Sequence, residues 1–180
     1  MKSDVVILHY TCPPVVGGVE QLIAAHAGLL ADRGYKTRII TGKGEPFRPD
    51  PELLVINEEL DRGVVSDRFF AMAEGIYRSL CSALVGVELC VVHNAFTLHF
   101  NLPLTAALAR LVKQGGCPRI VAWCHDVSWK NDIYIPKMRD SYPWTLLKEP
   151  LDGVRYVVVS ELRRWELADL MGVSPEQFWV

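Results

Sequence analysis

The segment that most constrains the fold of this chain runs from Val5 to Thr41, where an apolar run, a pair of glycines, a helical pattern and a second apolar run follow in order. The first run, VVILHY, is apolar almost throughout, which is typical of a parallel strand covered on both faces. Apolar residues then recur at helical spacing between Val19 and Leu30, and Gly34 suits the position just after a helix. A strand, a glycine turn, a helix and a strand make up half of a nucleotide-binding fold.

Gly17 and Gly18 form the turn before this helix. Glycine can adopt positive φ and leaves no side chain between the backbone and a ligand, and the unpaired N–H groups at the start of a helix attract anions. The pair matches neither the G-x-G-x-x-G fingerprint nor the phosphate loop that ends in Gly-Lys-Ser/Thr. Two interpretations therefore stay open, a ligand-binding loop and glycines that only turn the chain.

Length and charge bound the class of protein. The chain has 180 residues, 50% of them hydrophobic, which is enough for one domain with its own core. The net charge of −2 and the absence of a basic block argue against nucleic acid as a partner. The five cysteines form no C-x-x-C pair, so we expect reduced thiols and neither a disulfide framework nor a metal site. Because no secretory leader and no membrane-spanning run are seen, we expect a cytoplasmic protein.

Strand and helix patterns continue to alternate along the rest of the chain. We expect strands at 53–56, 87–93, 119–125 and 155–160, and helices at 67–85, 102–112 and 161–171. This alternation predicts an α/β fold, a Rossmann-like parallel sheet with helices on both faces. Residues 177–180 are β-prone, and we expect residues 1–180 to be one domain, cut from a longer protein near a domain boundary.

Polar residues follow several of the predicted strands, at the edge of the sheet where folds of this type bind ligands. His93 and Asn94 follow one strand and His125 and Asp126 follow the next, so we expect them on one rim. A His-Asp pair with a second His on the neighbouring strand favours a functional role over simple packing. Ser160, in contrast, is expected only to cap the helix that follows it.

The other three histidines carry less information. His9 lies inside a predicted strand and His26 on the apolar face of a predicted helix, so we interpret both as packed polar groups of the core. His99 is compatible with either a structural or a functional role.

Several segments, taken in order, resemble the N-terminal half of a retaining glycosyltransferase of family 4, one half of the GT-B architecture of two Rossmann-like domains. They read PPVVGGVEQLI and LADRGYKTRIITG, then VVHNAF, then VAWCHDVSW, then VVVSELRRWELADLMGVSPEQFWV. Each motif alone is loose, and the ordered set over nearly the whole chain carries the resemblance. It implies that the donor-binding residues lie beyond Val180 in a second domain, so the isolated chain is expected to be inactive.

The resemblance also implies a reaction and a set of site residues. A transferase of the hexosyltransferase type would move a sugar from a nucleoside-diphosphate sugar to a hydroxyl of a carbohydrate or lipid-linked acceptor, with retention of configuration and without a metal or other cofactor. His125 would contact the transferred sugar near its anomeric centre and is the candidate catalytic residue. The candidate substrate-binding residues are Gly17, Gly18, Glu20, Asn94, Phe96 and Asp126.

Two other classes of protein stay open, half of another sugar-nucleotide enzyme such as an epimerase and a non-catalytic Rossmann-like binding domain. Residues 130–150 mix cations with tyrosine and tryptophan, which suits an acceptor loop or peripheral contact with the inner face of a membrane. The plainer interpretation, a long surface loop with a short helix, is the one we favour. The sugar, the acceptor and the oligomeric state are not determined by these patterns.

Overall fold

The computed structural model describes residues 4–47, 52–55 and 65–180. Its strands are β1 (Asp4–Thr11), β2 (Lys36–Lys43), β3 (Glu52–Val55), β4 (Leu89–His93), β5 (Arg119–Cys124), β6 (Val154–Val158) and β7 (Phe178–Trp179). They form one seven-stranded sheet in the order β3-β2-β1-β4-β5-β6-β7, and every neighbouring pair is parallel. The predicted Rossmann-like parallel sheet is therefore confirmed.

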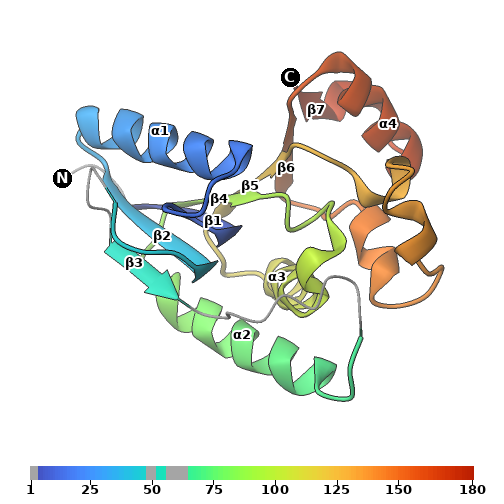
Figure 1. Cartoon of the computed structure of the whole chain (residues 1–180), viewed down its shortest axis with the longest axis horizontal. Helices are drawn as coiled ribbons and strands as arrows, with labels where there is room; N and C mark the ends of the chain where they lie inside the picture. Colours follow the sequence, from blue (N-terminus) through green and yellow to red (C-terminus); the bar gives the residue numbers. More distant parts are fainter. Residues whose placement is uncertain (1–3, 48–51, 56–64) are drawn as a thin grey trace.

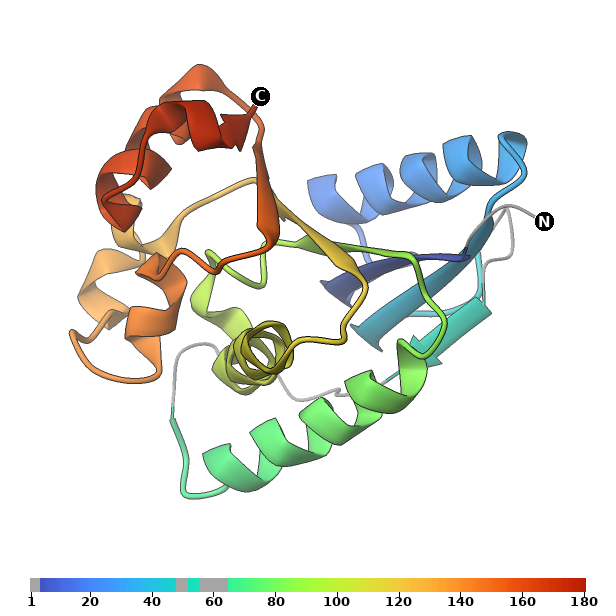
Figure 2. The same cartoon turned by 180° about the vertical axis from the view of Figure 1, so that it is seen from behind.

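Helices cover both faces of this sheet, as predicted. They are α1 (Gly18–Asp32), α2 (Phe69–Ala83), α3 (Leu102–Gln114) and α4 (Glu161–Met171). Short 3-10 helices also occur, namely η1 (His99–Asn101), η2 (Ser128–Lys130), η3 (Ile135–Lys137), η4 (Trp144–Lys148) and η5 (Pro175–Gln177). Figures 1 and 2 show α1 on one side of the sheet, with α2 and α3 on the other. Helix α1 connects β1 to its neighbour β2, and β3 lies next to β2. The chain then returns to place β4 on the other side of β1, so the order of the strands reverses at β1.

The core consists of two clusters, one on each face of the sheet. Successive β1 side chains alternate between them, because side chains along a strand point to opposite faces. Ile7 packs with Ile23 of α1 on one face, whereas Val6 and Leu8 belong to the larger cluster with Leu108 of α3 on the other. The larger cluster also contains residues of α2 and α4, which places α4 on the same face as α3.

Helix ends follow local chemistry that the residues predict. The Oγ of Ser160 accepts a hydrogen bond from the N–H of Arg163 at 3.3 Å, which confirms the predicted cap of α4. Gly172, after α4, and Gly34, after α1, have φ of 64° and 76°, a left-handed conformation that favours glycine. Asn101 caps α3 in the same way as Ser160 caps α4, accepting from the N–H of Leu104 at 3.0 Å.

The observed elements differ from the predicted ones mainly at their boundaries. β5 ends at Cys124, so His125 belongs to the turn that follows, and β6 ends two residues before Ser160. β-prone residues continue past the point where the hydrogen-bonded ladder ends, which makes strand ends hard to place from sequence. The predicted strand at 177–180 is confirmed in part by β7, whereas Ile56 lies outside the described residues.

Candidate functional site

A pocket lies at the centre of the sheet, beyond the carboxyl ends of β1 and β4. Chain connections leave these two neighbouring strands in opposite directions, and such a switch point is where open parallel sheets bind ligands. The pocket has a volume of about 240 Å³. It is lined by His9, Tyr10, Thr11, Gly18, Val19, Glu20, Asn94, Leu98 and Phe100. Three predicted site residues, Gly18, Glu20 and Asn94, are thus brought together there.

Glu20 closes the α1 side of this pocket with a buried carboxylate. The hydroxyl of Thr11 donates a hydrogen bond to its Oε1, and Nε2 of His9 lies 4.0 Å from the same oxygen. Its Oε2 turns back toward Gly17, where a Cβ would collide with it. The carboxylate therefore sits beside the N-terminus of α1, where the helix dipole stabilises a negative charge.

The backbone angles at Gly17 and Gly18 and the space around them show what each glycine does. Gly17 is the N-cap of α1 with φ of −169° and ψ of 164°, an extended conformation that any residue adopts, and Gly18 is not among the residues with positive φ. The turn therefore does not use the positive φ that glycine can adopt. A Cβ on Gly17 would instead force the Glu20 carboxylate to move, whereas a Cβ on Gly18 would meet no other atom within 4 Å.

Two histidines meet where β4 and β5 end. His93 is the last residue of β4 and is completely buried, and its ring lies nearly parallel to that of His125, with an angle of 21° and a centroid distance of 5.3 Å. Nδ1 of His93 and Nε2 of His125 are 3.0 Å apart, a hydrogen-bond distance. The two strand ends thus converge on one rim, as the sequence predicts.

Asn94 connects the pocket to this histidine pair. It has φ of 61°, a conformation that asparagine tolerates better than most residues, and its N–H donates to the carbonyl of Trp123 at 3.0 Å. Its Oδ1 accepts a hydrogen bond from the backbone N–H of His125 at 2.9 Å. One residue therefore borders the pocket and also fixes the backbone of the candidate catalytic histidine.

Burial keeps the histidines of this region neutral. Removal from water lowers the pKa of His93 to about 2 and that of His125 to about 4, and the repulsion of neighbouring histidines adds to both shifts. At neutral pH these rings accordingly offer hydrogen bonds and no positive charge.

His9 and His26 occupy the packed positions that their sequence context indicates. Nδ1 of His9 donates to the carbonyl of His93 at 3.0 Å, and His9 is 5% exposed. The half-buried ring of His26 packs on Trp123 with a centroid distance of 4.7 Å. His9 nevertheless also lines the pocket, a role that its sequence pattern does not indicate.

Asp126 and Phe96 lie outside the pocket. The Asp126 carboxylate accepts from the Val127 N–H and the Asn131 side chain, each at 2.9 Å, and pairs with Arg163 of α4 at 2.9 Å. It therefore joins the turn after β5 to α4. Phe96 is 2% exposed and belongs to the larger core cluster, because an apolar ring in this turn folds inward. Substrate contacts of these two residues stay predictions.

His99, which the sequence left undecided, has a structural position. It is completely buried, and its Nδ1 lies 2.8 Å from Oγ of Ser128, which also accepts from the His99 N–H. This pair ties η1 to η2 beneath the rim.

Comparison with known proteins gives the family. The model of Glycosyltransferase Family 4 matches residues 16–180. This chain belongs to glycosyltransferase family 4. Among solved structures, the family 4 domain is similar to WaaG, a glycosyltransferase involved in lipopolysaccharide biosynthesis, with a TM-score of 0.60 and 16% sequence identity. A search of curated protein sequences gave no match.

The similarity to WaaG covers 97% of this chain and 43% of the WaaG chain, so the family 4 domain spans less than half of that protein. The expected fold, one Rossmann-like half of a GT-B glycosyltransferase, is confirmed.

No group of three or more His, Cys, Asp or Glu side chains among residues 4–47, 52–55 and 65–180 is arranged to hold a metal ion. None of the helices in the same ranges combines the length and the apolar character needed to cross a membrane.

The two glycines of the family 4 domain give a matched pair of variants. We expect Gly17→Ala to lower the free energy of unfolding by about 1–2 kcal/mol, because the new Cβ displaces the buried Glu20 carboxylate from Thr11. Gly18→Ala should change it by about 0.5 kcal/mol or less, since its Cβ fits without collision. Urea unfolding of both variants at pH 7 measures the difference, and equal stabilities would contradict the close approach described for Gly17.

Proposed function

We propose that this family 4 domain is the acceptor-side half of a retaining glycosyltransferase, which moves a sugar from a nucleoside-diphosphate sugar to an acceptor hydroxyl. The observation that carries the proposal is the pocket of about 240 Å³ at the switch point between β1 and β4. Membership of the family supports transfer chemistry, and the residues around the pocket support the division of roles between the two halves.

The pocket walls suit a carbohydrate. Val19, Leu98 and Phe100 supply apolar surface, against which the C–H face of a sugar ring packs, and the Glu20 carboxylate supplies an acceptor for its hydroxyl hydrogens. A ligand with this combination of faces is an acceptor sugar, free or carried on a lipid.

The charge at the start of α1 favours the acceptor over the donor at this position. A diphosphate would meet the Glu20 carboxylate, which already sits beside the helix N-terminus near Gly17. The negative charges of the diphosphate and of the carboxylate would repel each other. The donor diphosphate would therefore be bound mainly by basic residues of a second domain. The Gly17–Gly18 loop then faces the acceptor.

His125 is not one of the pocket-lining residues, but its backbone is bonded to Asn94, which is. We propose that it contacts the transferred sugar through a neutral ring. In same-face attack the leaving phosphate oxygen takes the acceptor proton, and no protein nucleophile is required. The contribution of the domain is then positioning and electrostatic stabilisation, and we propose that no metal or other cofactor takes part.

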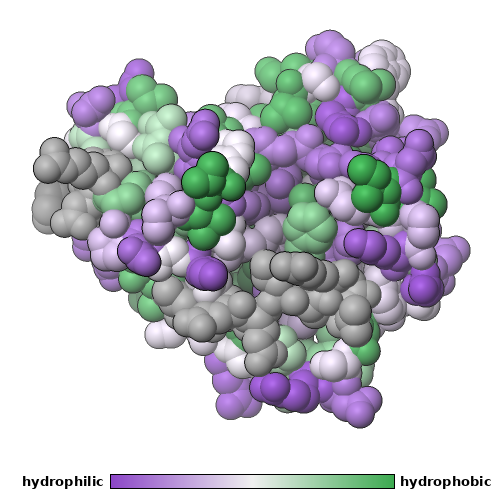
Figure 3. Space-filling model, in the orientation of Figure 1, coloured by the Kyte–Doolittle hydropathy of each residue, from purple (hydrophilic) through white to green (hydrophobic). Residues whose placement is uncertain are grey.

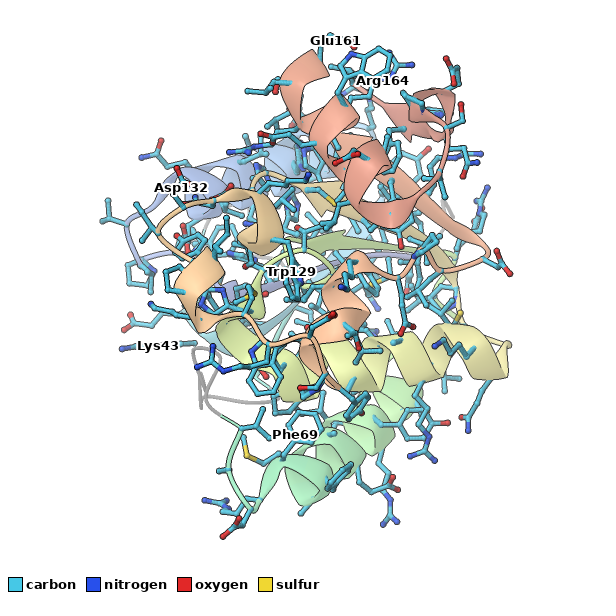
Figure 4. The ribbon with its side chains drawn as sticks, turned by 90° about the vertical axis from the view of Figure 1, so that its right-hand side faces the viewer. Lys43, Phe69, Trp129, Asp132, Glu161 and Arg164 are labelled. Carbon is cyan, nitrogen blue, oxygen red and sulfur yellow. The ribbon has the colours of Figure 1, made fainter. Side chains whose placement is uncertain are left out.

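For residues 130–150 the favoured interpretation is a surface loop, and the alternative is a peripheral contact with a lipid-linked acceptor or with the inner face of a cytoplasmic membrane. Ile133 and Tyr142 are 74% and 52% exposed in this segment, and Lys137 is exposed as well. In Figure 4, Trp129 lies near the centre of the view and Asp132 at its outer edge. Figure 3 shows apolar residues on its visible face as separate patches among hydrophilic ones.

An assay with nucleotide sugars tests the proposal. The chain should be expressed alone and together with whatever its gene encodes after Val180, and both proteins incubated with UDP- and GDP-sugars and a panel of glycoside acceptors. We expect acceptor-dependent release of nucleoside diphosphate only from the longer protein, and little heat when UDP or GDP is titrated into the chain alone. Micromolar binding of either diphosphate to the chain alone would overturn the division of roles.

A further inference from the structure

The hydrogen bond between the two stacked histidines can run in either of two directions, and the surroundings of the other ring nitrogens decide which one it takes. Nδ1 of His93 and Nε2 of His125 are 3.0 Å apart, and between two neutral rings one nitrogen must donate and the other must accept. Each neutral imidazole carries one hydrogen, so the direction of this bond also decides what the other nitrogen of each ring offers.

The second nitrogen of His93 decides the direction. Nε2 of His93 is buried and has no hydrogen-bond partner among the residues that the structure describes. If the hydrogen of His93 were on Nε2, a buried N–H would be left unpaired, which is rare and costly in folded proteins. With the hydrogen on Nδ1, the N–H is used in the bond to His125 and only a lone pair stays unpartnered.

We infer that His93 is a positioning residue, which donates from Nδ1 to Nε2 of His125 and thereby holds the hydrogen of His125 on Nδ1. His125 then offers a fixed N–H donor to whatever group lies beside it. None of the described residues hydrogen-bonds this Nδ1, and the atom is not among the buried unpaired ones, so it is open to solvent or to a ligand.

The surroundings hold both rings in the orientation that this bond needs. The His125 backbone is tied to Asn94, and the His93 carbonyl accepts from Nδ1 of His9, which must therefore be the protonated nitrogen of His9. Low pKa values of about 2 and 4 keep His93 and His125 neutral at pH 7. Each ring then carries one hydrogen, and only one of the two hydrogens lies in the bond between the rings. The catalytic meaning of the inference rests on the proposed function of His125, whereas the placement of the hydrogen does not.

Nitrogen-15 NMR of the imidazole rings tests the inference on the chain itself, without any substrate. We expect about a tenfold excess of the Nδ1–H form at His125 in the wild-type chain at pH 7, as one net hydrogen bond can supply. His93→Phe keeps a stacked ring but removes the donor, and should abolish this excess. His93→Gln keeps an N–H that can reach Nε2 and should restore it.

His26→Phe is the matched control, because His26 also packs beside His93, with a centroid distance of 5.6 Å, but is not hydrogen-bonded to His125. The control should leave the His125 signal unchanged. The inference is overturned if wild-type His125 is mainly in the Nε2–H form, if His93→Phe leaves the excess in place, or if His93→Gln behaves like His93→Phe. Should His93→Phe fail to fold, the wild-type spectrum and the His93→Gln variant still decide. None of these results changes the outcome expected in the sugar-transfer assay, which tests the proposed function separately.

Discussion

His125→Ala is expected to lower the turnover number of the active glycosyltransferase by about 100-fold or more, the effect of losing one positioned transition-state contact. His125 lies in the turn just after β5, with one ring nitrogen bonded to His93 and its backbone bonded to Asn94, so its position varies little before substrate arrives. The KM for the donor should change less than the turnover number, because the contact is proposed to strengthen as charge develops near the anomeric centre. Initial rates at several donor concentrations measure both quantities.

A matched variant separates catalysis from packing. His26→Ala removes a ring of the same cluster that lies on α1 and does not line the pocket, and should keep the turnover number within about threefold. Both substitutions should lower stability somewhat, so rates must be expressed per folded molecule, with thermal unfolding measured on the same samples. If His125→Ala lowers only stability and keeps its specific activity, then His125 is a packing residue.

The free energy of unfolding is expected to fall by about 2 kcal/mol or more between pH 7 and pH 5, because buried histidines resist protonation. The pKa of His93 is about 2 in the folded chain, and an unfolded histidine titrates near 6.5. Below pH 6.5 the unfolded chain therefore binds protons that the folded chain does not, and this favours unfolding increasingly as the pH falls. His125 adds to the effect down to about pH 4, its own folded pKa, but by less because it is partly exposed.

Urea unfolding at pH 7, 6 and 5 measures this dependence. His93→Gln provides the comparison, since an amide does not titrate, and its stability should fall less steeply over the same interval. The range stops at pH 5 so that most carboxylates keep their charge. Parallel curves for the two proteins would show that His93 does not hold a low pKa in the folded state.

Local patterns predicted the fold of this family 4 domain well and its site only in part. Continuous apolar runs and helical spacing are set by nearest neighbours, so the order of strands and helices and the helix ends at Ser160 and Gly34 could be recognised. The pocket depends on contacts between distant segments. Leu98 and Phe100 line it from a turn and a 3-10 helix, where no spacing marks them.

Two residues show why motif positions alone mislead. Phe96 lies inside the motif VVHNAF yet points into the core, because a turn after a buried strand can bury an apolar ring as easily as expose it. Gly17 looked like a residue chosen for its backbone freedom, but its φ is ordinary and the space beside it is what matters. In both cases the deciding contact is made by a side chain that the motif does not specify.

The double attachment of Asn94 limits how an enzyme built on this domain could evolve. Its side chain borders the pocket and carries the backbone of His125, so a substitution that altered the pocket at this position would also move the candidate catalytic ring. Val19 and Phe100 also pack against the core clusters, but the His125 backbone does not bond to either side chain. New acceptor preferences would therefore arise through the wall residues, while residue 94 stays asparagine.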